Sequence, residues 1–406
     1  MNHTHVPIPF SPPDITEQEI EEVVSVLRSG WITTGPKTKE FEEALAGFCG
    51  TRQFLAVNSA TAALEMALRT LEIGPGDEVI TSAYTFTATA SVVLHVGAKL
   101  VLVDTLPDSY EMDPTALEQA ITSHTKAIIA VDLGGVMCDY PSLVSLAEEK
   151  RGLFSPSGPL QEALGRIAVL ADAAHSLGAQ RGGLRSGQGA DMSSFSFHAV
   201  KNLTTAEGGG LTCRPNFPVD QEALFRSIRI SCLHGQTKSA LEKTRMGSWE
   251  YDIVEPGFKC NLTDIASALG LAQLRRYPAM LQRRKEIIAL YNRFFSDSER
   301  FSFLAHQGAD FSSSGHLYLL RIKGYGQQER ERLISYMTQH QVAVNVHYKP
   351  LPLLTAYRNL GFSIQNYPNS YALYENEITL PLHTLLSDES VEYVAQTLLN
   401  GVEQMR

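Results

Sequence analysis

A lysine in the middle of the chain occupies a position where a charged side chain is costly. Lys201 follows the aromatic segment SFSFHAV, which the residue types predict to be a short buried strand, and precedes NLTTAEGGG. An ammonium group that leaves a buried strand must be paired or neutral. A lysine in an apolar pocket has a lowered pKa and forms Schiff bases readily. The plainer alternative is a lysine whose head reaches solvent from the end of the strand.

A carboxylate and an anion site are indicated elsewhere in the chain. Asp172 ends the apolar run IAVLAD, and ligands in open α/β sheets bind at the carboxyl ends of strands. Thr61 lies at the start of the helical pattern TAALEMALRTLEI, after the predicted strand FLAVNS. Free N–H groups at a helix start bind anions. Both positions could instead be ordinary N-caps.

These groups, together with an aromatic side chain, match the needs of one cofactor. Pyridoxal 5′-phosphate requires a lysine for its aldehyde, a carboxylate that keeps its ring nitrogen protonated, a flat group against its ring and donors for its phosphate. Each signal is weak alone, but their order and their placement at strand ends are much more specific. The candidates are Lys201 for the aldehyde, Asp172 for the nitrogen, Phe86 for the ring, and Ala60, Thr61 and Ser196 for the phosphate.

The elements that must position these residues alternate between strand and helix. Strands are predicted at EVITS, KLVLVDTL and TKAIIAVDL, which favours an α/β fold with a mostly parallel central sheet sandwiched by helices. Because 406 residues exceed the usual limit of a single core, we expect two domains. We place a large α/β domain at residues 1–265 and a smaller C-terminal α+β domain at residues 266–406. The second includes VAVNVHYKPL, predicted to be a strand that ends at His347 and Tyr348.

Composition and charge disfavour several classes of protein. The formal net charge of −10 argues against nucleic-acid binding. The five cysteines are scattered without CxxC pairing, which fits a reducing cytosol and gives neither a zinc site nor a disulfide framework. The first residues lack the pattern of a signal peptide, and no apolar run approaches the ~18–20 residues of a membrane span. We therefore expect a soluble, cytoplasmic protein without a metal site.

Nearly the whole chain resembles the sugar aminotransferases of the DegT/DnrJ/EryC1/StrS family. These belong to the fold-type I (aspartate aminotransferase-like) pyridoxal-phosphate enzymes. The lysine segment and the NLTDI segment carry the most specific part of the resemblance. The matching segments are GWITTGP, NSATAALEMAL, GPGDEVITSAYTFTATA, ADAAHSLGA, FSFHAVKNLTTAEGGG, PGFKCNLTDIASALGLAQL, VNVHYKPL and LPLH.

The resemblance implies a role for each matching residue around the cofactor. His175 matches a position near the ring hydroxyl. Asn261 matches an asparagine that reaches the phosphate from the neighbouring subunit, which implies a homodimer with shared active sites. The other implied contacts are Lys201 as the Schiff-base lysine, Asp172 at the pyridine nitrogen, Phe86 against the ring, and Ala60, Thr61 and Ser196 at the phosphate.

Two further segments match the sugar side of the family's pocket. They contribute Trp31, Ile32 and Thr33, and later His347 and Tyr348. The residues alone leave the role of the first segment open. GWITTG could be a substrate contact, because it places an aromatic side chain and two hydroxyls in one exposed loop, or a plain connection between two helices.

The resemblance also implies a reaction. L-Glutamate donates its amino group, the cofactor passes through pyridoxamine 5′-phosphate, and a keto-sugar linked to a nucleotide diphosphate is aminated for amino-sugar, surface-polysaccharide or glycan biosynthesis. The run SFSFHAVKNLTTAEGG is closest to members that act on 4-keto-6-deoxy sugars, which favours amination at C4. The alternatives are a sugar dehydratase, whose branch carries histidine where Lys201 stands, a fold-type I enzyme of amino acids alone, and a non-catalytic regulator.

Overall fold

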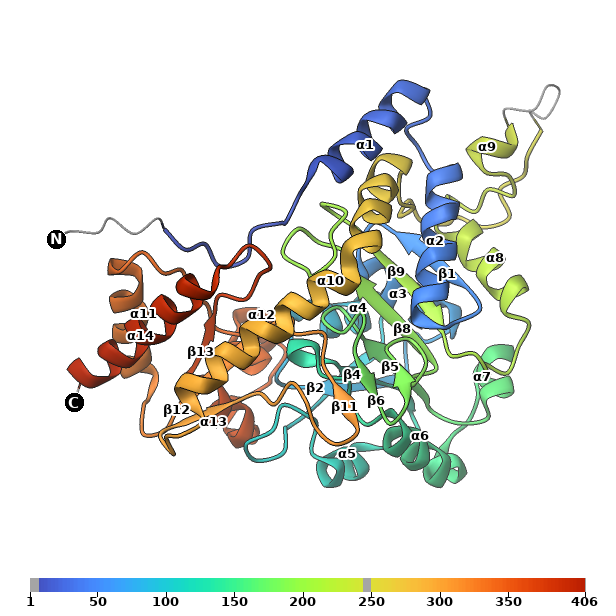
Figure 1. The fold of residues 1–406 in the computed structure, drawn as a ribbon. Helices are drawn as coiled ribbons and strands as arrows, with labels where there is room; N and C mark the ends of the chain where they lie inside the picture. The colour runs from blue at the N-terminus through green and yellow to red at the C-terminus, as the bar shows by residue number, and fades with distance from the viewer. Residues whose placement is uncertain (1–6, 244–249, 406) are drawn as a thin grey trace.

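The computed structural model describes residues 7–243 and 250–405, and a seven-stranded sheet lies at its centre (Figure 1). The strand order is β1-β9-β8-β5-β4-β2-β3. Neighbouring strands from β8 to β3 are parallel, whereas β9 is antiparallel to both β1 and β8. The predicted mostly parallel sheet is therefore confirmed. The strands are β1 (Phe54–Val57), β2 (Glu78–Ser82), β3 (Lys99–Val103), β4 (Thr125–Val131), β5 (Ala168–Asp172), β8 (Met192–Ser196) and β9 (Gly209–Cys213).

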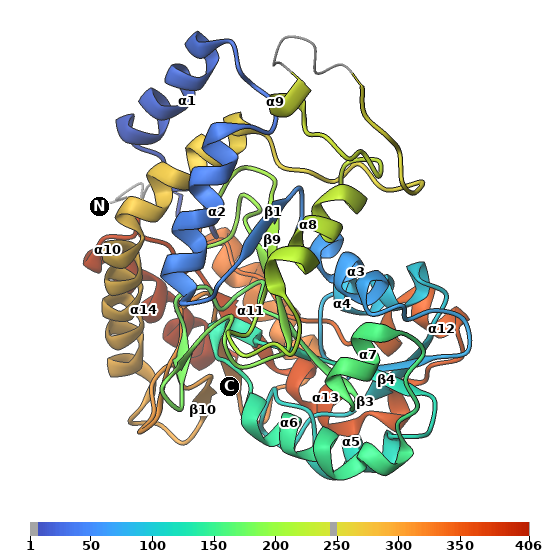
Figure 2. The ribbon, with the colours of Figure 1, turned by 90° about the vertical axis from the view of Figure 1, so that its right-hand side faces the viewer.

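Helices cover both faces of this sheet because its strands carry apolar side chains on both sides. In β4, Ala127 and Ile129 pack into one layer and Ile128 packs into the other. Figure 2 shows α2 on one side of β1 and β9, and α3 and α8 on the other. One layer contains α3 (Ala60–Thr70), α4 (Thr87–His95), α7 (Pro159–Leu164) and α8 (Gln221–Ser231); the other contains α2 (Pro36–Cys49), α5 (Pro114–Ala120), α6 (Tyr140–Glu149) and the first half of α10.

One long helix connects the central sheet to the C-terminal part of the chain. α10 (Asp264–Phe295) has Thr263 as its N-cap, whose side chain accepts a hydrogen bond from the Ala266 N–H. Its first half packs against α1 (Glu17–Ser29) and α2, and its second half contributes Tyr291 to the C-terminal core. The predicted domain boundary at residue 265 falls at the start of this helix. The division of the chain into residues 1–265 and 266–406 stays a prediction.

A small antiparallel sheet and two helices form the C-terminal core with the end of α10. The sequence prediction of a strand that ends at His347 and Tyr348 is wrong. Residues 342–348 instead make isolated bridges, between Val342 and Ile8 and between Asn345 and Thr379. The sheet consists of β10 (Phe301–Phe303), β12 (Tyr318–Ile322) and β13 (Glu377–Leu380), with helices α11 (Gln327–Gln339) and α14 (Asp388–Gln404).

Shorter elements complete the described chain. None of the helices in residues 7–243 and 250–405 combines the length and the hydrophobicity that a membrane crossing needs. The shorter helices are α9 (Ala240–Lys243), α12 (Thr355–Asn359), α13 (Pro368–Glu375), and the 3-10 turns at Leu133–Gly135, Lys150–Leu153, Leu351–Leu353 and Ile364–Asn366. The remaining strands are β6 (Gln180–Arg181), β7 (Leu184–Arg185) and β11 (Phe311–Ser312).

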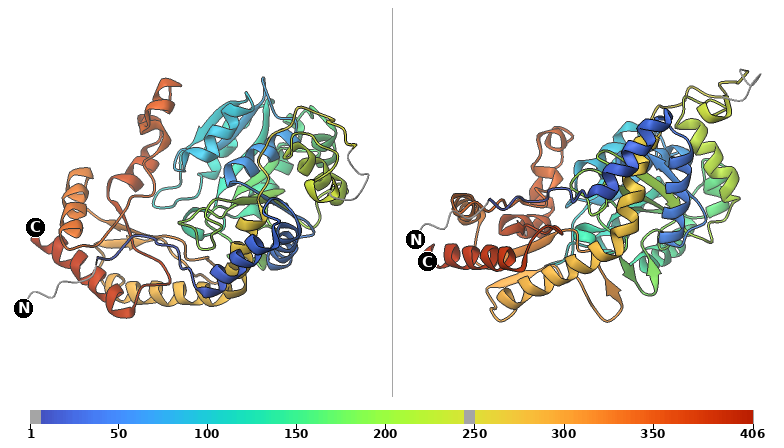
Figure 3. Two further views of the ribbon diagram at one scale, coloured as in Figure 1. Left: turned by 90° about the horizontal axis from the view of Figure 1, so that it is seen from above. Right: turned by 45° about the horizontal axis from the view of Figure 1, so that its top comes forward.

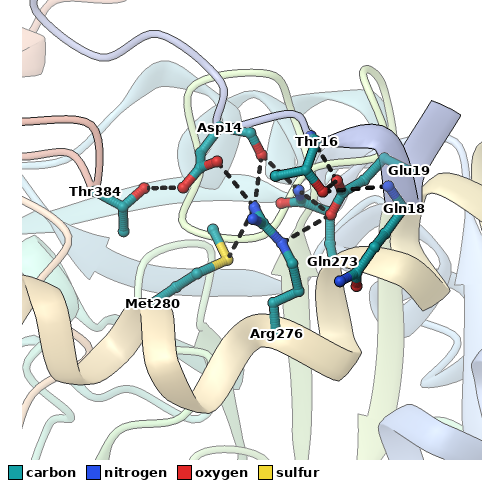
Figure 4. Close-up of polar contacts among 8 residues, drawn as sticks. All are labelled: Asp14, Thr16, Gln18, Glu19, Gln273, Arg276, Met280 and Thr384. Carbon is teal, nitrogen blue, oxygen red and sulfur yellow. Dashed lines mark hydrogen bonds and ion pairs between the residues drawn. The ribbon is translucent and has the colours of Figure 1, made fainter.

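The N-terminal segment, residues 8–14, crosses from the C-terminal core to α1 along α10 (Figure 3). At its start, the Ile8 N–H donates to the Gln341 carbonyl at 2.8 Å. At its end, Asp14 accepts hydrogen bonds from Arg276 at 2.9 Å and from Thr384 at 2.5 Å (Figure 4). Both ends of the segment are therefore tied to parts of the chain that come more than two hundred residues later.

Candidate active site

A cavity of about 390 Å³ lies at the carboxyl ends of β5 and β8, where the sequence predicts ligand binding. The fold divides the predicted site residues into two groups. The cavity group lines the wall and consists of Ala60, Thr61, Phe86, Asp172, His175, Ser196, Lys201, His347 and Tyr348. The loop group lies outside this wall and consists of Trp31, Ile32, Thr33 and Asn261.

Asp172 is a buried carboxylate that two donors fix in place. It ends β5 and is 7 % exposed. Thr89 Oγ1 donates to Oδ2 at 2.7 Å, and the Ala174 N–H donates to Oδ1 at 3.2 Å. Burial raises the pKa of Asp172, and these hydrogen bonds and the charge of Lys201 oppose the shift. A cationic N–H group in the cavity would stabilise the ionised carboxylate.

Lys201 lies in a turn, and the strand before it is shorter than the predicted SFSFHAV. β8 ends at Ser196, and the Lys201 N–H donates to the His198 carbonyl at 2.9 Å. The next residue anchors this turn, because Asn202 Nδ2 donates to the Ser314 carbonyl at 2.9 Å. Burial lowers the pKa of the Lys201 amine to about 8, although the nearby carboxylate opposes the shift. The amine therefore becomes neutral, and able to attack a carbonyl, at a lower pH than an exposed lysine does.

The start of α3 forms the part of the wall that can bind an anion. Ser59 is the N-cap, and the N–H groups of Ala60 and Thr61 have no acceptor within the helix. Gly209 packs directly on this turn, since a Cβ there would lie 2.2 Å from the Ser59 carbonyl carbon. The hydroxyls of Thr61 and Ser196 line the same cavity. The glycine run therefore brings β9 against a helix start that offers the donors a phosphate needs.

His175 is neutral and has one tautomer. Burial and the charge of Lys201 keep the pKa of His175 well below its usual range. The Gly134 N–H donates to Nδ1 at 3.2 Å, so the ring proton is assigned to Nε2. Nε2 then donates to the Tyr348 hydroxyl oxygen at 3.1 Å. The Tyr348 hydroxyl keeps its own proton for a donor contact inside the cavity.

Two aromatic contacts shape another part of the wall. Phe86 is 56 % exposed, and its ring centroid lies 5.9 Å from that of Tyr348. His347 stacks on Phe10 with ring centroids 5.6 Å apart. Phe86 thus has a ring face available to a flat ligand, and the stacking predicted for it stays a prediction.

Hydrogen bonds hold the two segments of the loop group together near the start of α10, outside the cavity. Asn261 Nδ2 donates to Thr34 Oγ1 at 2.5 Å, and the Asp264 N–H donates to the Thr33 carbonyl at 3.2 Å. Ile32 is 50 % exposed. One chain therefore presents the loop group on an exposed apolar surface outside its own cavity. The segment that leads to Asn261 exposes further apolar side chains, Tyr251, Ile253, Val254 and Phe258.

Several wall residues were not predicted from the sequence. Ser11 Oγ donates to the Val200 carbonyl at 3.1 Å, which holds the N-terminal segment beside the lysine turn. The prolines of PIPFSPP predict extended backbone there, but they do not show where it packs. No periodicity marked the histidine in SSSGH as a site residue. The unpredicted residues of the wall include Phe10, Ser11, His198, Val200, Glu207 and His316.

Comparison with known proteins identifies the family. The profile of the DegT/DnrJ/EryC1/StrS aminotransferase family matches residues 13–399. The chain belongs to this family. The spore coat polysaccharide biosynthesis protein SpsC of Bacillus subtilis (strain 168) is 37 % identical to this aminotransferase over 401 residues, which cover 98 % of this chain and 97 % of SpsC.

Solved structures of similar proteins agree with this assignment. A Streptococcus pneumoniae protein named "Putative sugar aminotransferase Spr1654", solved in a PMP form, is 54 % identical, has a TM-score of 0.95 and covers 98 % of both chains. The same protein has been solved in a PLP form. Helicobacter pylori PseC, an aminotransferase involved in the biosynthesis of pseudoaminic acid, is 30 % identical, with a TM-score of 0.85 and coverage of 98 % of this chain and 100 % of PseC. The predicted family, fold type, aminotransferase activity and pyridoxal-phosphate cofactor are confirmed.

The wall of this aminotransferase fits pyridoxal phosphate in its donor and acceptor chemistry. The Lys201 amine suits an aldehyde, because its pKa is lowered. The buried Asp172 suits a protonated ring nitrogen, and the start of α3 suits a phosphate. The separate contacts assigned to these residues remain proposals.

Proposed function

We propose that this aminotransferase moves the amino group of L-glutamate to a keto-sugar linked to a nucleotide diphosphate, at C4 of a 4-keto-6-deoxy sugar. One observation carries the proposal: the amine of Lys201, the carboxylate of Asp172 and the start of α3 share one cavity wall. The names of the relatives support a sugar acceptor and a role in amino-sugar synthesis for surface polysaccharides or glycans.

Lys201 is the proton carrier in this proposal. Bound pyridoxal phosphate supplies an electron sink, which makes the α-proton of the amino donor acidic. Lys201 Nζ would hold the bound cofactor, and the amine of the donor would take its place. The released Nζ then removes the α-proton and later returns a proton, acting as base and as acid. A pKa near 8 suits both tasks at cellular pH.

The other wall residues hold what Lys201 acts on. The Asp172 carboxylate accepts a hydrogen bond from the protonated ring nitrogen, and Thr89 keeps that carboxylate in place. The start of α3 binds the phosphate. Tyr348, which accepts from His175, directs its own hydroxyl proton to an oxygen of the bound molecule.

The proposal includes a homodimer that shares its active sites. The loop group lies outside the cavity of its own chain, and the apolar side chains around it would be covered by a second copy. Asn261 of one chain would then reach the phosphate site of the other. The five cysteines are all unpaired and buried, which supports the expected reducing, cytoplasmic compartment.

A two-stage assay tests the proposed function. Protein loaded with pyridoxal phosphate is expected to be yellow and to lose that colour when L-glutamate is added. The bleached protein is then offered UDP-, dTDP- and GDP-linked 3-keto and 4-keto sugars, and NMR of each product locates the new amine. Colour that returns with a C4-amino sugar supports the full proposal. Failure of L-glutamate to bleach the protein contradicts the donor, and amination at C3 contradicts the position.

The sugar dehydratase and the regulator make different predictions in the same assay. A dehydratase would consume the keto-sugar without forming a stable amino-sugar. A regulator would bind ligands without any change of colour on adding L-glutamate. The presence of Lys201, with its lowered pKa and its place in the cavity, favours transamination over both.

A further inference from the structure

A buried carboxyl group lies behind the cavity and takes no part in the proposed function. Glu377, in β13, is 0 % exposed. Its Oε1 accepts from Thr379 Oγ1 at 2.5 Å, and its Oε2 accepts from the His347 N–H at 3.0 Å. Arg321 stands opposite it in the sheet but pairs with Asp108 at 2.7 Å. Glu377 is therefore hydrogen-bonded to two neutral groups, the Thr379 hydroxyl and the His347 N–H, and His347 is a residue of the cavity wall.

The imidazole of His347 connects this carboxyl group to the cavity. Its Nδ1 lies 2.9 Å from Thr379 Oγ1, and the side chain lines the cavity. Among the described residues, Nε2 has no hydrogen-bond partner. Burial and the charge of Lys201 lower the pKa of His347 to about 3, so the ring is neutral and carries one N–H. Phe10 stacks on this ring, and the Tyr84 hydroxyl donates to the His347 carbonyl at 2.9 Å, which fixes its position.

The place of the ring proton depends on the protonation state of Glu377. A threonine hydroxyl has one proton to donate. When Glu377 is ionised, Thr379 donates to Oε1 and accepts from Nδ1–H, which leaves Nε2 of His347 as an acceptor. When Glu377 is protonated, Oε2 still accepts from the His347 N–H, so Oε1 carries the proton and donates it to Thr379. Thr379 then donates to Nδ1, and the ring proton lies on Nε2.

The two states differ by one proton in total, and the two hydrogen bonds of Thr379 keep their partners but reverse direction. Starting from protonated Glu377, His347 Nε2 releases its proton into the cavity. The Thr379 proton moves to Nδ1, and the Glu377 proton moves to Thr379 Oγ1. The carboxyl group ends ionised, the ring stays neutral, and one proton has left the protein.

We propose that Glu377 and Thr379 are positioning residues that determine whether His347 donates or accepts a hydrogen bond in the cavity. The proposal rests on the proposed function, because the carboxylate of the amino donor and the keto oxygen of the acceptor both need a donor. Protonated Glu377 gives the form of His347 that binds them. Ionisation of Glu377 converts that donor into an acceptor and weakens substrate binding.

The surroundings of Glu377 set the pH at which it ionises, and at which His347 changes tautomer, close to neutral. Burial raises the pKa of Glu377 to about 8, while its two hydrogen bonds and two arginines oppose the shift. His347 Nε2 is therefore a donor below about pH 8 and an acceptor above it. The titratable and charged groups that face Glu377 from neighbouring elements are Tyr84, Tyr110, Arg321, Arg330, His347 and Tyr348. Burial raises the pKa of each of these three phenols far enough that they stay neutral through this change.

The first test reads the tautomer directly. In ¹⁵N-histidine-labelled protein loaded with pyridoxal phosphate, the His347 resonances are assigned by their loss in His347→Asn. We expect the protonated nitrogen to change from Nε2 to Nδ1 with a midpoint near pH 8. Glu377→Gln should keep the proton on Nε2 at every pH, because the glutamine NH₂ donates to Thr379 and its oxygen accepts from the His347 N–H.

A pair of Thr379 variants separates this relay from a structural effect. Thr379→Ser keeps a hydroxyl and should keep the change near pH 8, whereas Thr379→Val has a similar shape without a hydroxyl and should lose it. A wild-type protein that shows one tautomer throughout, or a Glu377→Gln variant that titrates like the wild type, would overturn the proposal.

A second measurement connects the tautomer to substrate. The rate of bleaching at different L-glutamate concentrations gives an apparent Kd at each pH. We expect this Kd to rise about tenfold in the wild type from about pH 7 to about pH 9, and not in Glu377→Gln, since one hydrogen bond to a charged group is lost. Equal pH profiles for both proteins contradict the role in binding. If L-glutamate bleaches neither protein at any pH, the proposed function fails, and the tautomer measurement still decides the relay.

Discussion

The cavity group and the loop group both lie in turns and at the ends of helices and strands, but the folding of one chain brings only the cavity group together around the cavity. Most of the cavity group lies at strand ends, at helix starts and in turns around the central sheet, and His347 and Tyr348 join it from the C-terminal part, so one chain brings its members together. The loop group has its own hydrogen bonds, such as that between Asn261 and Thr34, but lies on an exposed apolar surface. Folding of a single chain can assemble the cavity group, whereas we expect formation of the dimer to bring the loop group to a cavity.

Loss of the amine in the cavity group should have the largest effect. Lys201→Ala is expected to retain pyridoxamine phosphate but to lose turnover completely, because no other amine lines the described wall. Bound cofactor is measured by absorbance and turnover by 2-oxoglutarate release. Lys39→Ala, which removes an exposed lysine of α2, is the matched control and should leave both unchanged. Transamination at a normal rate in the Lys201 variant would show that the lysine has been misassigned.

Neutralising the buried carboxylate should have the next largest effect. Asp172→Asn keeps the shape of the side chain but removes the charge that faces the ring nitrogen, and kcat should fall by about 10²- to 10³-fold. Asp113→Asn, which exchanges one good N-cap for another at the start of α5, should not change kcat. A loss below about tenfold for the Asp172 variant would mean that another group protonates the ring.

The lowered pKa of Lys201 should determine how the rate of cofactor capture, the reaction of cofactor-free protein with pyridoxal phosphate, depends on pH. Capture joins the neutral amine to the cofactor aldehyde and releases water. The group is protonated below its folded pKa, so the capture rate should fall about tenfold for each pH unit below about 8 and level off above it. Stopped-flow absorbance of cofactor-free protein measures this rate. A profile that still rises at pH values near 10 would indicate an ordinary, exposed lysine.

Mixing variants tests whether the two groups meet between chains, with the smallest expected signal. Asn261→Ala should weaken cofactor retention by about tenfold, the value of one charge-assisted hydrogen bond. If active sites are shared, mixing Asn261→Ala with Lys201→Ala creates hybrid dimers that contain one intact site, and activity at limiting cofactor should exceed the average of the two variants.

A second mixture serves as the control for this comparison. Lys201→Ala mixed with His175→Ala combines two defects of the cavity group, so each hybrid site keeps one defect and no gain is expected. A gain of activity in both mixtures, or in neither, would contradict the expectation that the loop group, unlike the cavity group, acts in the site of the neighbouring chain.

The sequence predicted the cavity group best where the signal is local. Asp172 and Thr61 are the ends of recognisable strands and helices, and the parallel sheet brings such ends together without further information. The strand before Lys201 was predicted to run to Val200 although it ends at Ser196, because SFSFHAV has strand propensity beyond the point where pairing with β9 ends. Propensity does not show where a partner strand stops.

Other parts of the site depend on how distant segments pack, which no local pattern contains. Phe10 reaches the wall because its segment is held by Val200 and by residues of the C-terminal core. His316 enters the wall from the loop before β12, where its Nδ1 lies 2.9 Å from Asn202 Oδ1. Asn261 and Trp31 were predicted from resemblance, which also implies that Asn261 serves the neighbouring subunit; both lie outside the cavity of their own chain.

The N-terminal segment has a consequence for how the protein is made. Residues 8–14 are synthesised long before the partners that hold them, Arg276, Gln341 and Thr384. The hydrogen bonds that hold this segment can therefore all be present only after Thr384 has been synthesised. The part of the wall that contains Phe10 and Ser11 is therefore completed late, after the strands and turns that carry Asp172 and Lys201 have been made.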